Sequence, residues 1–353
     1  MNYSKEIFFS LLFCIISVSI ISQTDTAKQE NLEVPIYKAA CKLLDSANYK
    51  DAISMYKNAI KINPTYYQAF NKMAFAKYKL KDYKGAEKDL IKSKKNPQNN
   101  FDIYKTLALI YLDTKKYEEA KVSLDSAILL NPDDSEVLYS QAKLMFLGKS
   151  YKLALSTCEA ALDINPRYME VYFLKGEIKY LQKEYNYAIK EITDGLKFEN
   201  AAQPNYDAYK IRAKARYEVQ DYKNAVNDWN LYLEAFPNDE QSLILRGINK
   251  IELNDNTDAI VDFDAAIKIN PKNPMSYNYR GVAKGENKQF VEALKDFDTA
   301  IKLKFDYGSA FVNRAAVKHA SKDKRGACED LHKADALGDE MAPQLIETYC
   351  KLK

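Results

Sequence analysis

An alanine recurs along this chain at an almost constant spacing, and this spacing constrains the fold more than any other feature. The recurring residues are Ala52, Ala86, Ala120, Ala154, Ala188, Ala225, Ala259, Ala293 and Ala327. Successive alanines are 34 residues apart, except that Ala188 and Ala225 are 37 apart. A fixed period of this length is typical of a solenoid, in which each repeat buries its apolar face against its neighbours.

One period, residues 101–134, predicts two helices. Its first half carries apolar residues at the i, i+3, i+4 and i+7 spacing of one helix face. After a polar break, a second run with the same spacing ends at Asn131, because the following Pro132 disfavours helical geometry in the preceding residue. Each period therefore predicts an antiparallel helix pair. Glycine and proline number only 10 each, which agrees with helices joined by short connections.

The order of residues within each period resembles the tetratricopeptide repeat, with its leucine followed by glycine or alanine, its aromatic positions and its closing proline. The resemblance implies an all-α, right-handed superhelical solenoid of nine helix pairs over residues 33–341, followed by a capping helix at 342–353. We number the units repeats 1–9. They begin at Glu33, Tyr67, Phe101, Ser135, Met169, Tyr206, Glu240, Pro274 and Gly308.

The single long interval predicts a joint in the array. Repeats 1–5 span residues 33–200, the joint is placed at 201–205, and repeats 6–9 span residues 206–341. Asn200 stands where repeat 5 should have its closing proline. We expect the superhelical pitch to change at this joint.

The N-terminus differs in composition from the repeats. An apolar run from Ile7 to Ile21 turns polar after Ser22. The run is shorter than the roughly 20 residues of a membrane span but suits a secretory signal peptide. We therefore predict a signal peptide at 1–22, with an uncleaved N-terminal anchor as the alternative, and a linker at 23–32. The expected location is periplasmic or extracellular, or alternatively membrane-anchored.

Charged residues vary together within the repeats. A basic residue on the first helix is followed 16 residues later by an acidic residue in Arg212 and Asp228, Arg246 and Asp262, Arg280 and Asp296, and Arg314 and Asp330. Lys175 and Glu191 match them in repeat 5, whereas repeats 1, 3 and 4 lack both charges. Only repeat 2, with Met73 and Asp89, breaks the rule. We expect ion pairs joining the two helices of a repeat, with ligand binding as the alternative.

The resemblance also implies a concave groove lined by the first helix of each repeat, with the fifth, ninth and twelfth positions facing a partner. Large side chains at these positions are Phe75, Tyr78, Leu112, Tyr139, Phe146, Phe173, Tyr180 and Tyr217. From repeat 7 onward large side chains become fewer there. The resemblance thus implies binding of an extended or helical peptide. The alternative is that these side chains only pack successive first helices together.

Few residues suit catalysis. The chain has two histidines, His319 and His332, and no P-loop, nucleophile elbow, zinc-protease motif or glycine-rich nucleotide loop. His332 lies four residues after Cys328, but a zinc site would need side chains from several helices to converge, so we expect no metal or cofactor. The net charge of +3 gives no support to nucleic-acid binding, although related helical repeats read RNA.

These observations predict a non-enzymatic scaffold that binds a protein or peptide segment and no small-molecule substrate, in the cell envelope or secreted. A membrane-anchored assembly factor of a secretion or envelope complex is the alternative. Four cysteines follow the predicted signal peptide, and their connectivity is open. Cys158 occupies a small apolar position and is expected to be a buried thiol, while a bridge between Cys328 and Cys350 is possible because they fall in adjacent C-terminal elements.

Overall fold

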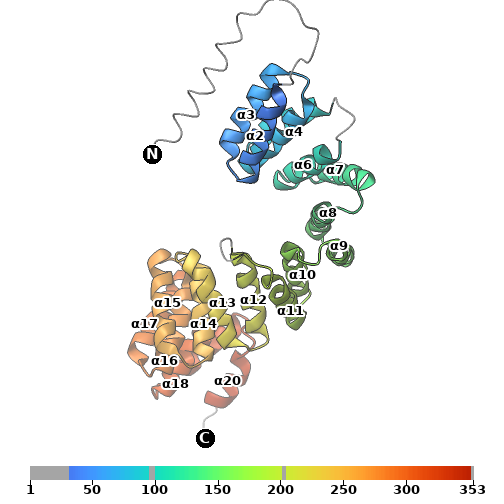
Figure 1. The fold of residues 1–353 in the computed structure, drawn as a ribbon. Helices are drawn as coiled ribbons and strands as arrows, with labels where there is room; N and C mark the ends of the chain where they lie inside the picture. The colour runs from blue at the N-terminus through green and yellow to red at the C-terminus, as the bar shows by residue number, and fades with distance from the viewer. Residues whose placement is uncertain (1–31, 95–99, 201–203, 351–353) are drawn as a thin grey trace, which may run out of the picture. The chain divides into compact units, whose positions relative to one another are not determined.

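The computed structural model describes residues 32–94, 100–200 and 204–350. These described residues form nineteen α-helices, α2–α20, and no β-strand (Figure 1). The all-α prediction is therefore confirmed. The predicted signal peptide at 1–22 lies outside the described residues, as do positions 201–203 of the predicted joint.

Consecutive helices alternate as the first and second helix of each repeat. The first helices are α2 (Glu33–Asp45), α4 (Tyr67–Lys79), α6 (Asn100–Asp113), α8 (Ser135–Leu147), α10 (Met169–Leu181), α12 (Tyr206–Glu218), α14 (Glu240–Glu252), α16 (Pro274–Glu286) and α18 (Gly308–Ala320). The second helices are α3 (Tyr49–Ile62), α5 (Tyr83–Ser93), α7 (Tyr117–Leu130), α9 (Tyr151–Ile164), α11 (Tyr185–Leu196), α13 (Tyr222–Ala235), α15 (Asn256–Ile269), α17 (Phe290–Leu303) and α19 (Lys324–Ala336), and α20 (Ala342–Tyr349) follows them.

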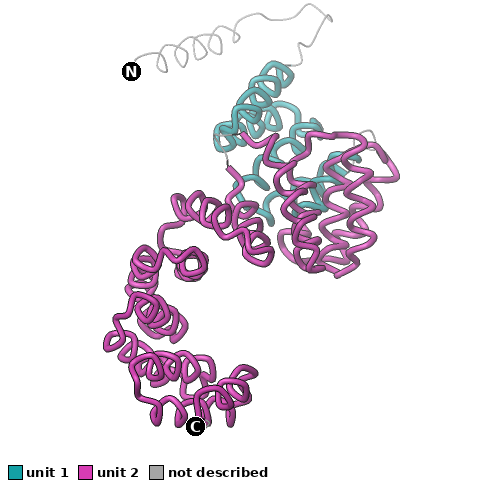
Figure 2. The backbone as a smooth tube through the Cα atoms, turned by 90° about the horizontal axis from the view of Figure 1, so that it is seen from below, with its two compact units in different colours: residues 1–110 teal, residues 111–353 magenta. Residues whose placement is uncertain are grey.

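The chain divides into two compact units, residues 1–110 and residues 111–353, which Figure 2 draws in teal and magenta. The boundary falls inside α6. Consequently the joint expected at 201–205 lies within the second unit, and the change of pitch expected there stays a prediction.

The recurring alanines explain how the helices pack. All nine are fully buried. In repeats 7 and 8, the first helix has a glycine where it packs against a phenylalanine of the second helix. A Cβ on Gly247 would lie 2.7 Å from the Phe263 ring, and one on Gly281 would lie 2.8 Å from the Phe297 ring. Small residues are thus required because the two helices of a repeat approach closely.

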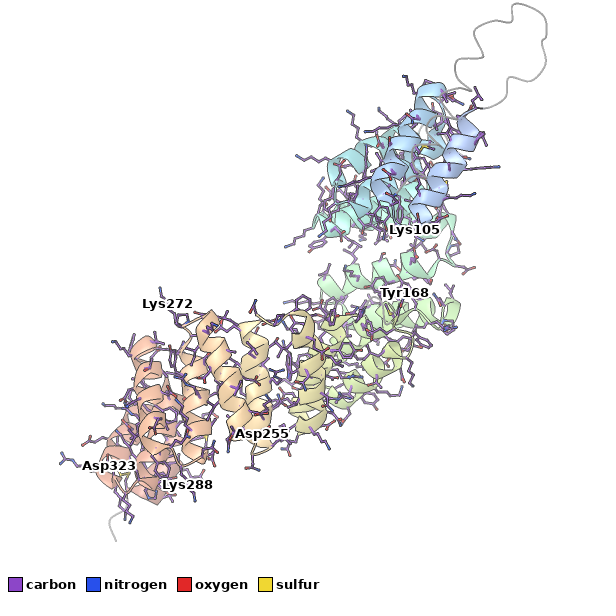
Figure 3. All side chains as sticks on the ribbon, turned by 60° about the vertical axis from the view of Figure 1, so that its left-hand side comes forward. Lys105, Tyr168, Asp255, Lys272, Lys288 and Asp323 are labelled. Atoms are coloured by element: carbon purple, nitrogen blue, oxygen red, sulfur yellow. A yellow bond between two sulfur atoms is a disulfide. The ribbon has the colours of Figure 1, made fainter. Side chains whose placement is uncertain are left out.

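The turn inside each repeat has one residue in the left-handed region. These residues are Ala47, Lys81, Lys115, Lys149, Lys183, Gln220, Asn254, Lys288 and Lys322, with φ between 58° and 71°. The left-handed residue follows the end of the first helix. Its own N–H group and that of the next residue donate hydrogen bonds to carbonyl groups in the last turn of that helix, as Ala47 and Asn48 do in repeat 1. In Figure 3, Asp255, Lys288 and Asp323 lie at one edge of repeats 7–9, and Lys272, in a turn between repeats, lies at the opposite edge.

The last helix closes the C-terminal end of the array. Ala342 is buried in an apolar cluster with Leu331, and Leu345 packs against that cluster. A disulfide joins Cys328 on α19 to Cys350, directly after α20. The predicted capping helix at 342–353 is thus observed as α20, and residues 351–353 lie outside the described residues.

The other two cysteines of the repeats are free thiols. Cys158 is buried, as the sequence predicts, and partly buried Cys41 accepts a hydrogen bond from the Tyr56 hydroxyl. In the part of the chain that the structure describes, no cluster of histidine, cysteine, aspartate and glutamate side chains is arranged to hold a metal ion. Among the same residues, no helix has the length and apolar character needed to cross a membrane.

Candidate functional site

The covarying charges meet between the two helices of each repeat. In repeat 8, the Arg280 Nε and Nη2 groups donate to both carboxylate oxygens of Asp296, with the Nε bond at 2.9 Å. The same two-bond arrangement joins Arg212 to Asp228, Arg246 to Asp262 and Arg314 to Asp330. Lys175 and Glu191 form a single contact of 3.2 Å in repeat 5.

A second cation also binds each of these aspartates, and sequence reasoning missed it. It comes from the first helix, four residues after the arginine. The contacts are Arg216 to Asp228 at 2.6 Å, Lys250 to Asp262 at 2.9 Å, Lys284 to Asp296 at 2.7 Å and Lys318 to Asp330 at 2.8 Å. We call the arginine, the aspartate and this second cation the charge clasp.

The second cation explains why repeat 2 broke the sequence rule. Asp89 is paired there with Lys77, which occupies the position of the second cation, although Met73 replaces the arginine. In the neutral repeats 1 and 4, the same position holds Leu43 and Met145. The covariation therefore extends to a third position, and comparing that position across the repeats would have revealed it.

A third bond from each clasp arginine reaches the preceding repeat. The Nη1 group of Arg246 donates to Asn230 at 2.9 Å, and that of Arg212 donates to Thr193 at 3.1 Å. In repeats 8 and 9 the acceptors are Asp264 for Arg280 and Asp298 for Arg314. The clasp thus ties three helices together. Its aspartates are buried, and the two cations beside each one offset the negative charge inside the array.

A hollow of about 290 Å³ is lined by residues of three successive first helices, α8, α10 and α12. We call it the groove hollow. Its apolar lining includes Tyr139, Phe146 and Phe173, three of the residues that the sequence placed in the groove. Its polar lining includes Lys143, Glu170, Glu177 and Asp207. Lys143 and Glu177 stand at the ninth position of their repeats, which is one of the three positions expected to face the groove. The sequence prediction missed these two residues because it selected only large apolar side chains at those positions.

The predicted groove residues differ in how much surface they offer. Leu112 and Phe173 are each only 7% exposed, and Phe173 lies in a core cluster with Ile192 and Ala208. These two residues favour the packing alternative. The rings at the twelfth position keep more surface and rest on the first residue of their own second helix, in the pairs Phe146–Tyr151, Tyr180–Tyr185 and Tyr217–Tyr222, with centroids 6.0, 5.7 and 5.7 Å apart.

The remaining predicted groove residues lie elsewhere. Tyr180 and Tyr217 line a second hollow of about 220 Å³, together with Trp229 and Asn249. In the first compact unit, Phe75 and Tyr78 lie 6.2 Å apart, and the Lys79 ammonium group lies over both rings at 5.1 and 5.7 Å.

The carboxylates of the groove hollow have different electrostatic surroundings from those of the charge clasp. Burial, together with the negative charge of Asp207, raises the pKa of Glu177, while Lys143 partly opposes this shift. Burial and the charges of Glu170, Cys158 and Glu177 raise the pKa of Tyr139 to about 12. The hollow therefore combines aromatic surface with negative charge that its own lysine does not fully balance.

A larger hollow of about 530 Å³ lies where the chain lacks a charge clasp. Gln141, at the arginine position of repeat 4, and Met145, at the second-cation position, both line it. Asp125, which corresponds to the residue that accepts the third arginine bond, lines it from α7. A shorter neutral side chain at the arginine position thus leaves open the space that an arginine fills in repeats 6–9.

Comparison with known proteins supports the repeat architecture. Residues 105–168 match the tetratricopeptide repeat family model. The solved structure of YrrB, a TPR protein with an unusual peptide-binding site, is 20% identical with a TM-score of 0.52, covering 56% of this chain and 97% of that chain. A tetratricopeptide repeat protein from Parabacteroides merdae is 19% identical with a TM-score of 0.46, covering 71% of this chain and 98% of that chain. Yeast Tom70 is 15% identical with a TM-score of 0.40, covering 90% and 88%. No curated protein matches this chain.

Proposed function

Because this chain is a tetratricopeptide-repeat protein, we propose that it is a non-enzymatic scaffold that binds a peptide or protein segment on the face formed by α8, α10 and α12. The groove hollow carries this proposal. Three successive first helices contribute to it, and Phe146 and Tyr139 give it aromatic surface. A concave site with apolar walls and a few polar groups is the usual form of a binding site.

The shape of the site suits a segment that inserts a side chain. Burying one leucine or phenylalanine side chain there would contribute about 1.5–3 kcal/mol. The second hollow, at Tyr180 and Tyr217, would extend the contact along the next repeats. YrrB, described as having a peptide-binding site, offers a precedent in a protein with this fold.

We place the scaffold in the cell envelope or outside the cell. The apolar run at 7–21 supports export, and the bridge between Cys328 and Cys350 suits an oxidising compartment. Cell fractionation with sequencing of the mature N-terminus tests this location. A chain recovered from the cytosol with Met1 in place would overturn it, and a membrane-bound chain with Met1 in place would establish the anchored alternative.

The binding proposal is tested by comparative affinity capture with the full-length chain from the native envelope fraction. The variant carrying Phe146→Ala and Tyr180→Ala removes two partly exposed groove rings. Tyr187→Ala, on the second helix α11 and 61% exposed, is the matched control. We expect the groove variant to lose a partner that both the parent chain and the control retain, with a similar melting profile. Equal capture by all three chains would refute the groove.

A further inference from the structure

The groove hollow holds more negative than positive charge. Glu170 and Glu177 on α10 and Asp207 on α12 face it with a single cation, Lys143 on α8. In the part of the chain that the structure describes, none of these three carboxylates forms a salt bridge or hydrogen bond. The four buried aspartates of repeats 6–9 each contact two cations, so the unpaired carboxylates of the groove hollow are an exception to that pattern.

Glu177 is the residue for which this exception matters most. Its side chain is partly buried, and burial together with Asp207 raises its pKa. Both effects disfavour the charged carboxylate, because water is partly excluded and a like charge lies nearby. A cation placed between Glu177 and Asp207 would offset both effects. The free hollow therefore favours a positively charged occupant over a neutral or negative one.

We propose that the groove hollow binds an extended peptide segment that inserts an apolar side chain against Phe146 and Tyr139 and places an adjacent lysine or arginine beside Glu177 and Asp207. This inference rests on the proposed function, since it names the chemistry of the partner at the same site. The aromatic wall supplies apolar contact area, while the carboxylates select the sign of the neighbouring charge. The hollow, at about 290 Å³, is far larger than the space that one water molecule occupies.

Fluorescence anisotropy with synthetic peptides tests the inference on the full-length chain. The probe is a short glycine–serine peptide with one leucine flanked by lysines. A second peptide replaces the lysines with glutamates, and a third replaces the leucine with serine. We expect the lysine peptide to bind about tenfold more tightly than the glutamate peptide at low salt, and this preference to shrink as salt is added.

Charge-neutralising variants locate the preference. The variant with Glu177→Gln and Asp207→Asn should lose most of the discrimination between the lysine and glutamate peptides. Glu159→Gln with Asp163→Asn removes the same charge from exposed positions on α9 and is the matched control. Because both double variants keep side-chain size, circular dichroism should show equal folding.

The outcomes separate this inference from the proposed function. If the peptides bind and Phe146→Ala weakens them, but lysine and glutamate peptides bind alike, the cationic preference is wrong and groove binding stands. If none of the peptides binds, the inference is overturned, while the envelope capture experiment still decides whether the groove binds a partner. If the parent chain is a dimer and the variant with Glu177→Gln and Asp207→Asn is a monomer, the occupant of the groove hollow is a second copy of this chain. That result also overturns the inference.

Discussion

Repeats 6–9 and repeats 4–5 have the same fold but differ in how many of their charged residues are paired. In repeats 6–9, each buried aspartate on the second helix accepts bonds from two cations of the first helix, and the arginine continues to the preceding repeat. Repeat 5 keeps one ion pair between its helices, Lys175 with Glu191, but its Glu170 and Glu177 face the groove hollow without a salt bridge to any described residue. One region therefore uses its charges for cohesion, and the other leaves charge available to a partner.

The difference also changes how the helices fill space. Where Gln141 replaces the clasp arginine, a hollow of about 530 Å³ lies between α7 and α8. In repeats 7 and 8, the guanidinium groups of Arg246 and Arg280 reach across to the preceding second helix. The clasp is thus a filling group as well as an ion pair. We therefore expect repeats 6–9 to be the part of the second unit that is more stable against unfolding.

Removing the buried carboxylate of the charge clasp in repeat 8 should have the largest effect on stability. Asp296→Thr alone leaves Arg280 and Lys284 without their shared carboxylate, and we expect it to cost about 3–5 kcal/mol, as for other broken buried pairs. The triple change Arg280→Gln, Lys284→Met and Asp296→Thr copies a neutral set that the chain already uses, and it should cost clearly less. Urea unfolding followed by circular dichroism measures both.

Hydrogen exchange of α16 and α17 controls for unfolding that is not two-state, as repeat arrays often open locally. Neutral repeat 4 offers a second control. Thr157 stands there at the position of Asp296, and Thr157→Ser should have little effect on stability. A triple variant less stable than the single Asp296→Thr variant would show that the clasp stabilises by more than mutual charge compensation.

Most of the fold was predictable because its signal repeats. The recurring alanines define nine periods, and the structure shows helices beginning at or one residue from each predicted start. The same repetition revealed Arg280 opposite Asp296, since the two charges change together between repeats. Repetition within one chain thus supplies the comparison that an isolated globular sequence does not provide.

The candidate site was less predictable because it depends on three helices at once. The twelfth-position rings followed from the repeat pattern, but burial of Phe173 depends on how α10 packs against α11 and α12. The acidic lining combines two repeat positions, since Glu177 stands at a ninth position, whereas Glu170 and Asp207 stand at second positions, outside the three positions assigned to the groove. Such a combination is visible only when neighbouring repeats are placed together.

The C-terminal disulfide should make the next largest contribution to the stability of repeats 6–9 against unfolding. Cys328 and Cys350 are separated by 22 residues, and a bridge of this span contributes about 2–4 kcal/mol in the chain-entropy description. We expect reduction to lower the stability of α19 and α20 and to leave repeats 4 and 5 almost unchanged. Urea unfolding with and without reductant, read by hydrogen exchange, measures the difference.

The variant with Cys328→Ser and Cys350→Ser should match the reduced parent chain and be insensitive to reductant. Cys158→Ala, which removes a buried free thiol, should keep the sensitivity of the parent chain. Equal loss of protection in repeats 4 and 5 on reduction would show that the disulfide stabilises the whole unit rather than its C-terminal end.

Glycine in the turn inside a repeat should have the smallest effect and should be nearly equal in clasped and neutral repeats. Ala47 in neutral repeat 1 and Gln220 in clasped repeat 6 have φ of 58° and 61°, and neither carries a charge. Relief of the left-handed strain should outweigh the entropy of glycine by about 0.5–1 kcal/mol. Ala47→Gly and Gln220→Gly should therefore each raise the urea midpoint slightly.

These two turns form a matched test of whether the charge clasp affects the backbone. The N–H after Ala47 donates to the carbonyl of Leu43 at 2.8 Å, and the N–H after Gln220 donates to the carbonyl of Arg216 at the same distance. Arg216 is a clasp cation, whereas Leu43 is its neutral counterpart. If Gln220→Gly stabilises clearly less than Ala47→Gly, the clasp already restricts the turn in repeat 6. Equal gains would show that the clasp acts through side chains alone, because the backbone bonds of the two turns are the same.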